Sequence, residues 1–165
     1  MQIASISMHP LRVYLDTSVI GGCFDQEFAE ASQKLMELVR MGIYHALISQ
    51  VTLDELIGAP KHVQAVIAQL GPDELTTLPI LPEVELLTDQ YLDAAIVTKK
   101  YREDAAHIAN ATIHHADVLV SWNFRHIVNL DKIRKFNAVN RANGFADLEI
   151  RSPRELIYGQ KKKDI

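Results

Sequence analysis

Hydrophobic and polar residues alternate along the chain in two patterns, one typical of strands and the other typical of helices. Apolar runs of strand length lie at 12–16, 43–49, 74–81, 116–121 and 148–152. Between them, apolar residues recur three and four positions apart, which is the spacing of one helix face. We therefore expect helices over 26–41, 51–58, 62–71, 82–101, 103–115, 131–144 and from 153 onward.

This alternation predicts an α/β protein with three α/β/α layers and a central, mainly parallel sheet of about five strands. Gly42, Gly71 and Gly144 follow the last periodic residues of three helices, where glycine commonly ends a helix. Pro79 stands at the far end of the third strand, which favours an outer position in the sheet. The chain shows no repeat or linker, and 165 residues fit one domain, so we expect a single domain over 1–165.

Composition narrows the possible partners and the compartment. The formal charge is −4 and the pI about 5.9, whereas proteins that bind nucleic acid over their whole surface are usually basic. Any contact with nucleic acid should therefore be local or mediated by metal. A single cysteine, Cys23, excludes an internal disulfide framework. The start "MQIASISMHP" is not typical of a signal peptide, no apolar run is long enough to span a bilayer, and "QKKKD" near the end is typical of a solvated tail. We expect a cytoplasmic protein without membrane contact.

Polar residues stand where the predicted strands end. Asp16 ends the first strand, Glu55 lies in the helix after the second, Asp104 opens the helix before the fourth, and Asn123 follows the fourth. In doubly wound sheets, ligands bind beyond the carboxyl ends of the strands. Each residue also has a local alternative. Asp16 and Asp104 can cap helices, Glu55 can complete a capping box begun by Thr52, and Asn123 can stabilise a turn.

Convergence of these residues would have a chemical consequence. Two carboxylates about 4 Å apart repel by roughly 4 kcal/mol at an effective dielectric constant of about 20. Without a cation, some of them would have to take up protons. Mg²⁺ and Mn²⁺ prefer oxygen ligands, and such a site suits hydrolysis of a phosphodiester by an activated water.

Three ordered motifs carry a resemblance to a known family. They are "YLDTSVI", "SQVTLDEL" and "REDAAHIANATIHHADVLVSWNFRHIVN". With them the chain resembles PIN-domain ribonucleases of the VapC type, the toxins of type II toxin–antitoxin pairs. The resemblance covers nearly the whole chain. It implies a Mg²⁺- or Mn²⁺-dependent endoribonuclease that leaves a 5′-phosphate and a 3′-hydroxyl, a cognate antitoxin partner and a small homodimer.

The resemblance also assigns roles to the strand-end residues. Asp16, Glu55 and Asp104 match the acidic residues that hold the metal in such nucleases. The family's fourth acidic position falls on Asn123, whose carbonyl oxygen can ligate a metal or hold a metal-bound water. Because an amide adds no negative charge, the number of metal ions stays open.

Neighbouring residues are candidates for supporting roles. Hydroxyl groups near the carboxylates can bind them or a metal-bound water; these belong to Thr17, Ser18 and Ser121. His107 lies one turn after Asp104, where it can contact a phosphate or the acidic residues and where carboxylates favour its protonated form; a packed histidine is the alternative.

Other residues are candidates for contacts with RNA. They are Arg125, Trp122 and His126, with Trp122 expected to be partly buried. Lys99, Lys100 and Arg102 form either a basic rim or a solvated helix end. The paired His114 and His115 point apart on a helix, which disfavours a shared metal site.

Two other functions remain open on the sequence. The first is a PIN-fold module that binds RNA or an antitoxin with weak catalysis, which the amide at Asn123 and the acidic pI favour. The second is a phosphotransferase with Asp16 as nucleophile, which is disfavoured because Ser18 stands where such enzymes carry a second aspartate. The RNA target is not indicated.

Overall fold

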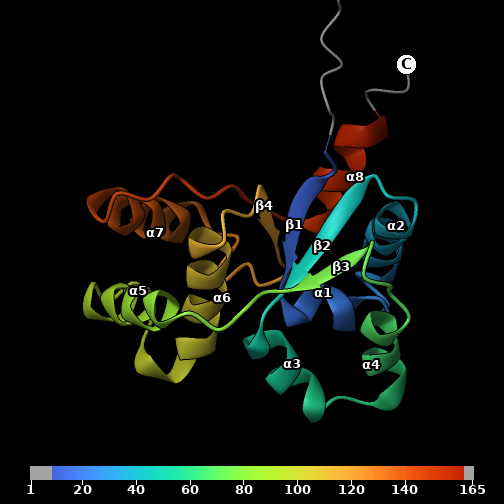
Figure 1. The fold of residues 1–165 in the computed structure, drawn as a ribbon, viewed down its shortest axis with the longest axis horizontal. Helices are drawn as coiled ribbons and strands as arrows, with labels where there is room; N and C mark the ends of the chain where they lie inside the picture. Colours follow the sequence, from blue (N-terminus) through green and yellow to red (C-terminus); the bar gives the residue numbers. More distant parts are fainter. Residues whose placement is uncertain (1–8, 162–165) are drawn as a thin grey trace, which may run out of the picture.

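Five parallel strands form the central sheet in a computed structural model that describes residues 9–161 (Figure 1). They are β1 (Leu11–Leu15), β2 (Tyr44–Ile48), β3 (Leu75–Thr77), β4 (Val118–Val120) and β5 (Ile150–Arg151). Their order across the sheet is β3-β2-β1-β4-β5, and each neighbouring pair is parallel. The expected sheet is confirmed, and β3 has the outer position that Pro79 predicts.

Helices cover both faces of this sheet and complete three layers. They are α1 (Thr17–Gly22), α2 (Ala29–Arg40), α3 (Gln50–Ile57), α4 (Lys61–Ala68), α5 (Pro82–Asp93), α6 (Arg102–Ile113), α7 (Leu130–Ala142) and α8 (Pro153–Lys161), with a 3₁₀ turn η1 (Lys99–Tyr101). Val13 and Leu15 face a core shared with α1, α2, α4 and α8. Tyr14, between them in sequence, faces the second core, with α5, α6 and α7. This alternation is the period of two of a strand buried on both faces.

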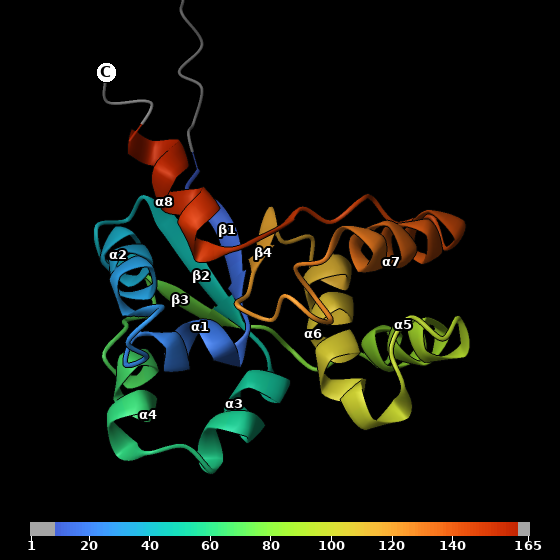
Figure 2. The ribbon, with the colours of Figure 1, turned by 180° about the vertical axis from the view of Figure 1, so that it is seen from behind.

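The connections create a switch point beside β1. The chain moves from β1 to β2 and β3 on one side, then crosses to β4 and β5 on the other. Past the carboxyl end of β1 lie α1 and α3, with α6 beside them (Figure 2). Loops that leave a sheet in opposite directions open a crevice between them, so ligands of such folds bind there.

The elements differ from the sequence predictions in three places. Helix α1 was not predicted, because its six residues include β-branched and glycine positions that disfavour helix. One helix over 82–101 was wrong: α5 ends at Asp93, and the chain turns through Ala95 at φ 56° before η1. The third strand spans only Leu75–Thr77.

Two sequence-based arguments concern the chain ends. The start of the chain, used to argue against a signal peptide, and most of the "QKKKD" tail lie outside the described residues. Within 9–161, no helix has the length and apolar character needed to cross a bilayer.

Candidate functional site

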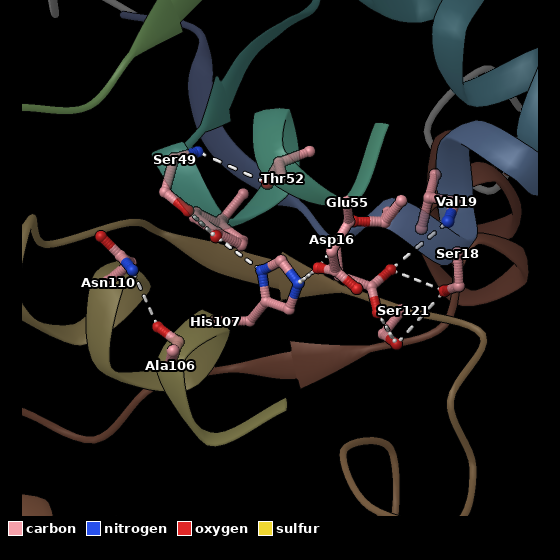
Figure 3. A network of polar contacts seen from close by, with 12 residues as sticks. Asp16, Ser18, Val19, Ser49, Thr52, Glu55, Ala106, His107, Asn110 and Ser121 are labelled. Atoms are coloured by element: carbon pink, nitrogen blue, oxygen red, sulfur yellow. Dashed lines mark hydrogen bonds and ion pairs between the residues drawn. The ribbon is translucent and has the colours of Figure 1, made fainter. Parts of the chain in front are cut away.

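Asp16 lies at the switch point, directly after β1, with only 4% of its surface exposed. Its Oδ1 accepts hydrogen bonds from Ser18 Oγ at 2.6 Å and from the Val19 amide at 3.3 Å. Its Oδ2 accepts one from Ser121 Oγ at 2.6 Å (Figure 3). The Val19 bond makes Asp16 the N-cap of α1, as the local alternative proposed. The serine bonds exceed what capping requires.

The two serines join the two sides of the switch point. Ser18 Oγ accepts a hydrogen bond from the Trp122 amide at 2.9 Å, and Ser121 Oγ accepts one from the Asn123 amide at 2.9 Å. Each hydroxyl has one hydrogen, and both hydrogens go to Asp16. Burial raises the pKa of Asp16, although the charge of His107 and these hydrogen bonds partly oppose that effect. The loop after β4 is therefore fastened to the start of α1 through one buried carboxyl group.

Glu55 approaches from α3 and is held by two side chains. Its Oε1 accepts a hydrogen bond from Thr17 Oγ1 at 3.0 Å, and His107 Nε2 lies 2.6 Å from the same oxygen. The Glu55 side chain is 37% exposed, whereas that of His107 is 2% exposed. The buried face of α6 thus reaches a carboxylate that stands at the surface, and we call this pair the Glu55–His107 corner.

A buried chain of hydrogen bonds fixes the other side of His107. Its Nδ1 lies 2.7 Å from the Tyr14 hydroxyl, which lies 2.7 Å from Ser49 Oγ. Ser49 is the N-cap of α3, the helix that carries Glu55, and forms its capping box with Thr52. The hydrogen bonds from Ser49 through Tyr14 and His107 to Glu55 form a closed ring with the segment of α3 between Ser49 and Glu55 (Figure 3).

The ring also determines where protons reside. The carboxylate of Glu55 only accepts hydrogen bonds when ionised, so His107 Nε2 must carry a hydrogen. Burial alone would lower the pKa of His107, but the Tyr14 oxygen and the bond to Glu55 outweigh it and raise that pKa to about 10. Burial would likewise raise the pKa of Glu55, but the bond and charge of His107 and the bond from Thr17 lower it.

Asp104 forms a second carboxylate–histidine pair, with His126. Its Oδ2 lies 2.8 Å from His126 Nδ1, and the two side chains are 21% and 11% exposed. Asn123 Oδ1 accepts a hydrogen bond from the His126 amide at 2.9 Å, so the amide side chain stabilises the turn, as one alternative proposed. We call this pair the Asp104–His126 corner.

Two local alternatives from the sequence are corrected. Glu55 does not complete a capping box begun by Thr52, because Thr52 already caps α3 with Ser49 and the Glu55 carboxylate is directed to α1 and α6. Asp104 does not cap its own helix: Tyr101 is the N-cap of α6, and Asp104 lies in the first turn. Both carboxylates are therefore available to the crevice.

The carboxylate oxygens of the site are the ligands that a hard divalent ion prefers, but the side chains are not arranged around a common point. Glu55 Oε2 and Asp104 Oδ1 have no hydrogen bond among the described residues. However, no group of three His, Cys, Asp or Glu side chains within 9–161 stands ready to hold an ion. Glu55 and Asp104, which we call the two outer carboxylates, each face a histidine instead. Metal binding would therefore require these side chains to turn toward one another.

The candidates for RNA contact occupy different environments. Trp122 is 5% exposed, and its Nε1 donates to Ser32 Oγ at 2.8 Å, which leaves little surface for RNA. Arg125 is exposed and lies over the Tyr101 ring. Arg102 is paired with Glu85 at 2.7 Å and Asp89 at 2.8 Å, so it does not belong to a free basic rim.

Sequence reasoning missed Tyr14 and Ser49. The sequence did contain a sign of this network, a tyrosine in the middle of a strand expected to be buried on both faces. A buried phenol hydroxyl requires a hydrogen-bond partner. His114 binds the Pro79 carbonyl rather than sharing a site with His115, as expected.

Comparisons with known proteins give the fold. No model of a known protein family matches the chain, and no curated protein matches it. Among solved structures, it is similar to a chain of VapBC2 from Rickettsia felis, determined bound to a DNA fragment from its promoter. The TM-score is 0.53 at 13% identity, with 86% of this chain and 98% of that chain covered. The three-layer PIN-like fold expected from the sequence motifs is thereby confirmed.

Proposed function

We propose that this protein is a Mg²⁺- or Mn²⁺-dependent endoribonuclease that hydrolyses RNA phosphodiester bonds with a metal-activated water. The observation that carries the proposal is the buried Asp16, which hydroxyls from both sides of the switch point bind. A carboxylate that only caps a helix needs one local hydrogen bond. Asp16 is also oriented by Ser121, 105 positions away, as expected of a carboxylate that binds a ligand. The PIN-like fold and the motifs shared with VapC-type ribonucleases support the same activity.

The chain's own residues would hold and orient the reacting groups. Asp16, Glu55 and Asp104 would bind the ion, which would supply Lewis-acid chemistry at the phosphodiester. Ser18 and Ser121 orient the Asp16 carboxylate. The histidines hold one oxygen of each outer carboxylate and leave the other for a ligand.

A matched pair of substitutions tests this function. With Mn²⁺ under single-turnover conditions, Asp16→Asn should cut RNA at least about 100-fold more slowly, because an amide neither supplies the charge nor accepts both serine bonds. Asp117→Asn is the control, since Asp117 accepts the Arg12 amide at the opposite end of β4. Equal cleavage rates for wild type and Asp16→Asn would contradict the nuclease proposal.

A second candidate function is an RNA- or antitoxin-binding module with weak catalysis. The pairing of both outer carboxylates with histidines favours it, because such pairs compete with a metal ion for the same groups. In the same assay, RNA binding without any Mn²⁺-dependent cleavage would select this candidate.

We propose two kinds of protein partner, an antitoxin and a second copy of this chain. VapBC2 was solved bound to promoter DNA, and we infer that this chain pairs with an antitoxin that restrains it. The motifs shared with VapC-type ribonucleases support a homodimer as well. Light scattering of the purified protein, alone and co-expressed with the product of an adjacent gene, measures both associations.

A further inference from the structure

Two hollows flank the candidate site and carry opposite charge. The hollow beside Glu55, of about 390 Å³, includes Asp54, Glu85 and Glu103 in its lining. Its one cation, Arg102, is already paired with carboxylates. The hollow beside Asp104, of about 260 Å³, is lined by Arg125, Lys132 and His126, and none of the described residues in its lining is acidic. A polyanion should approach over the second hollow.

Tyr101 lines this second hollow and contacts two cations, Arg125 in its lining and Lys100 beside it. Its ring lies 5.6 Å from Lys100 Nζ and 5.7 Å from Arg125 Cζ, and the His126 ring packs on it with centroids 4.1 Å apart. These distances are those of cation–π contacts, which hold a long side chain in place without neutralising it. Because these groups already surround the ring, Tyr101 supports the cations rather than offering a face to a base.

No carboxylate among the described residues pairs with the cations in and beside the hollow. Among the described residues, Lys100 and Arg125 form no ion pair. Lys132 Nζ donates one of its three hydrogens to the Ile96 carbonyl oxygen at 2.5 Å, and this backbone oxygen carries no formal negative charge. In a protein with a net charge of −4, these three groups form a local concentration of positive charge.

His126 connects the hollow to the acidic residues. Its ring lines the hollow, while its Nδ1 lies 2.8 Å from Asp104 Oδ2. A phosphate in the hollow would therefore lie one side chain away from Asp104.

We propose that this hollow, which we call the Tyr101 hollow, receives a backbone phosphate of single-stranded RNA next to the linkage at the site. The inference rests on RNA being the substrate in the proposed function. In this arrangement the RNA strand passes over η1 and the 123–132 segment and stays away from the acidic hollow beside α3. Recognition is of phosphate, through Lys100, Arg125 and Lys132.

The test compares two double variants of equal charge. Lys100→Ala/Arg125→Ala removes the two cations that contact the Tyr101 ring, one lining the hollow and one beside it. Arg40→Ala/Lys61→Ala removes two exposed cations on α2 and α4 that also form no ion pair among the described residues. Binding of a fluorescent 20-nucleotide single-stranded RNA is measured by anisotropy in EDTA, where metal-dependent cleavage does not occur. Circular dichroism melts check that both variants fold.

The hollow variant should bind at least about tenfold more weakly at low salt, and the control should change affinity less than about threefold. The slope of log K against log salt should fall by about 1.4, from about 0.7 for each lost contact with a single strand. Single-stranded DNA of the same sequence should lose the same factor, because phosphate is the group bound. A loss confined to RNA would overturn the phosphate assignment in favour of 2′-hydroxyl recognition.

Other outcomes separate this inference from the nuclease proposal. Equal weakening in both double variants would show diffuse binding and overturn the inference. Unchanged RNA affinity would also overturn it and point to another anionic partner, such as an acidic protein segment. If the hollow variant loses affinity while the wild type cuts no RNA with Mn²⁺, the hollow is supported and the nuclease proposal fails.

Discussion

The two carboxylate–histidine corners use the same pair of residue types in different surroundings. In the Glu55–His107 corner, the histidine is 2% exposed and both its ring nitrogens are hydrogen-bonded inside the second core. In the Asp104–His126 corner, the histidine ring packs on Tyr101 near the surface and opens onto a hollow. The histidine of the first corner is thus enclosed by the core, whereas the histidine of the second corner lines a hollow that a ligand can enter. The surroundings of the histidine thus determine whether a carboxylate–histidine pair contributes mainly to stability or to binding.

The largest expected difference between the corners is in stability. His107→Ala should lower the free energy of unfolding by about 2–4 kcal/mol, because it removes one of the two hydrogen-bond partners of the buried Tyr14 hydroxyl, removes the partner of Glu55 and leaves a cavity. His126→Ala should cost less than His107→Ala, because the His126 ring makes one hydrogen bond, to Asp104, whereas the His107 ring makes two. Urea unfolding of both variants in EDTA, with equal m-values, measures the two losses. Equal losses would show that burial does not distinguish the corners.

The difference between the corners also explains what the sequence predicts. The strand order follows from apolar runs and turn residues, and Asp16 is recognisable because a charge follows a buried strand directly. The pairing of Glu55 with His107 depends on how α3 and α6 are rotated against each other. That rotation is set by packing of the second core, over residues 52 positions apart, so no local pattern encodes it.

The failures of the sequence predictions have similar causes. Helix α1 forms because Asp16 caps it and because Val19 and Ile20 are buried, which overcomes weak propensity. The end of α5 depends on Ala95 adopting a positive φ, for which the sequence carries no glycine signal. The predicted basic rim does not include Arg102, because Arg102 forms ion pairs with Glu85 and Asp89 on α5, a contact between two helices that no local pattern indicates.

The pH dependence of stability should come mainly from the Glu55–His107 corner. The pKa of His107 is about 10 in the folded protein and 6.5 ordinarily, so the folded state holds its proton more tightly than the unfolded state. This contribution is fully present below pH 6.5 and is lost as the pH rises toward 10. The urea midpoint in EDTA should therefore fall across that window, and His107→Gln should flatten the fall. An unchanged slope in His107→Gln would assign the effect to another group.

The smallest expected effect concerns Asn123 in the Asp104–His126 corner. In Asn123→Asp the carboxylate can still accept the His126 amide, so the free energy of unfolding should change by less than about 0.5 kcal/mol. Because that oxygen serves the turn, Mn²⁺ affinity measured by calorimetry should change less than about threefold. Asn129→Asp is the matched control, since Asn129 caps α7 through the Lys132 amide in the same way. A tenfold gain in Mn²⁺ affinity for Asn123→Asp alone would place this side chain among the metal ligands and make the Asp104–His126 corner the stronger half of the site.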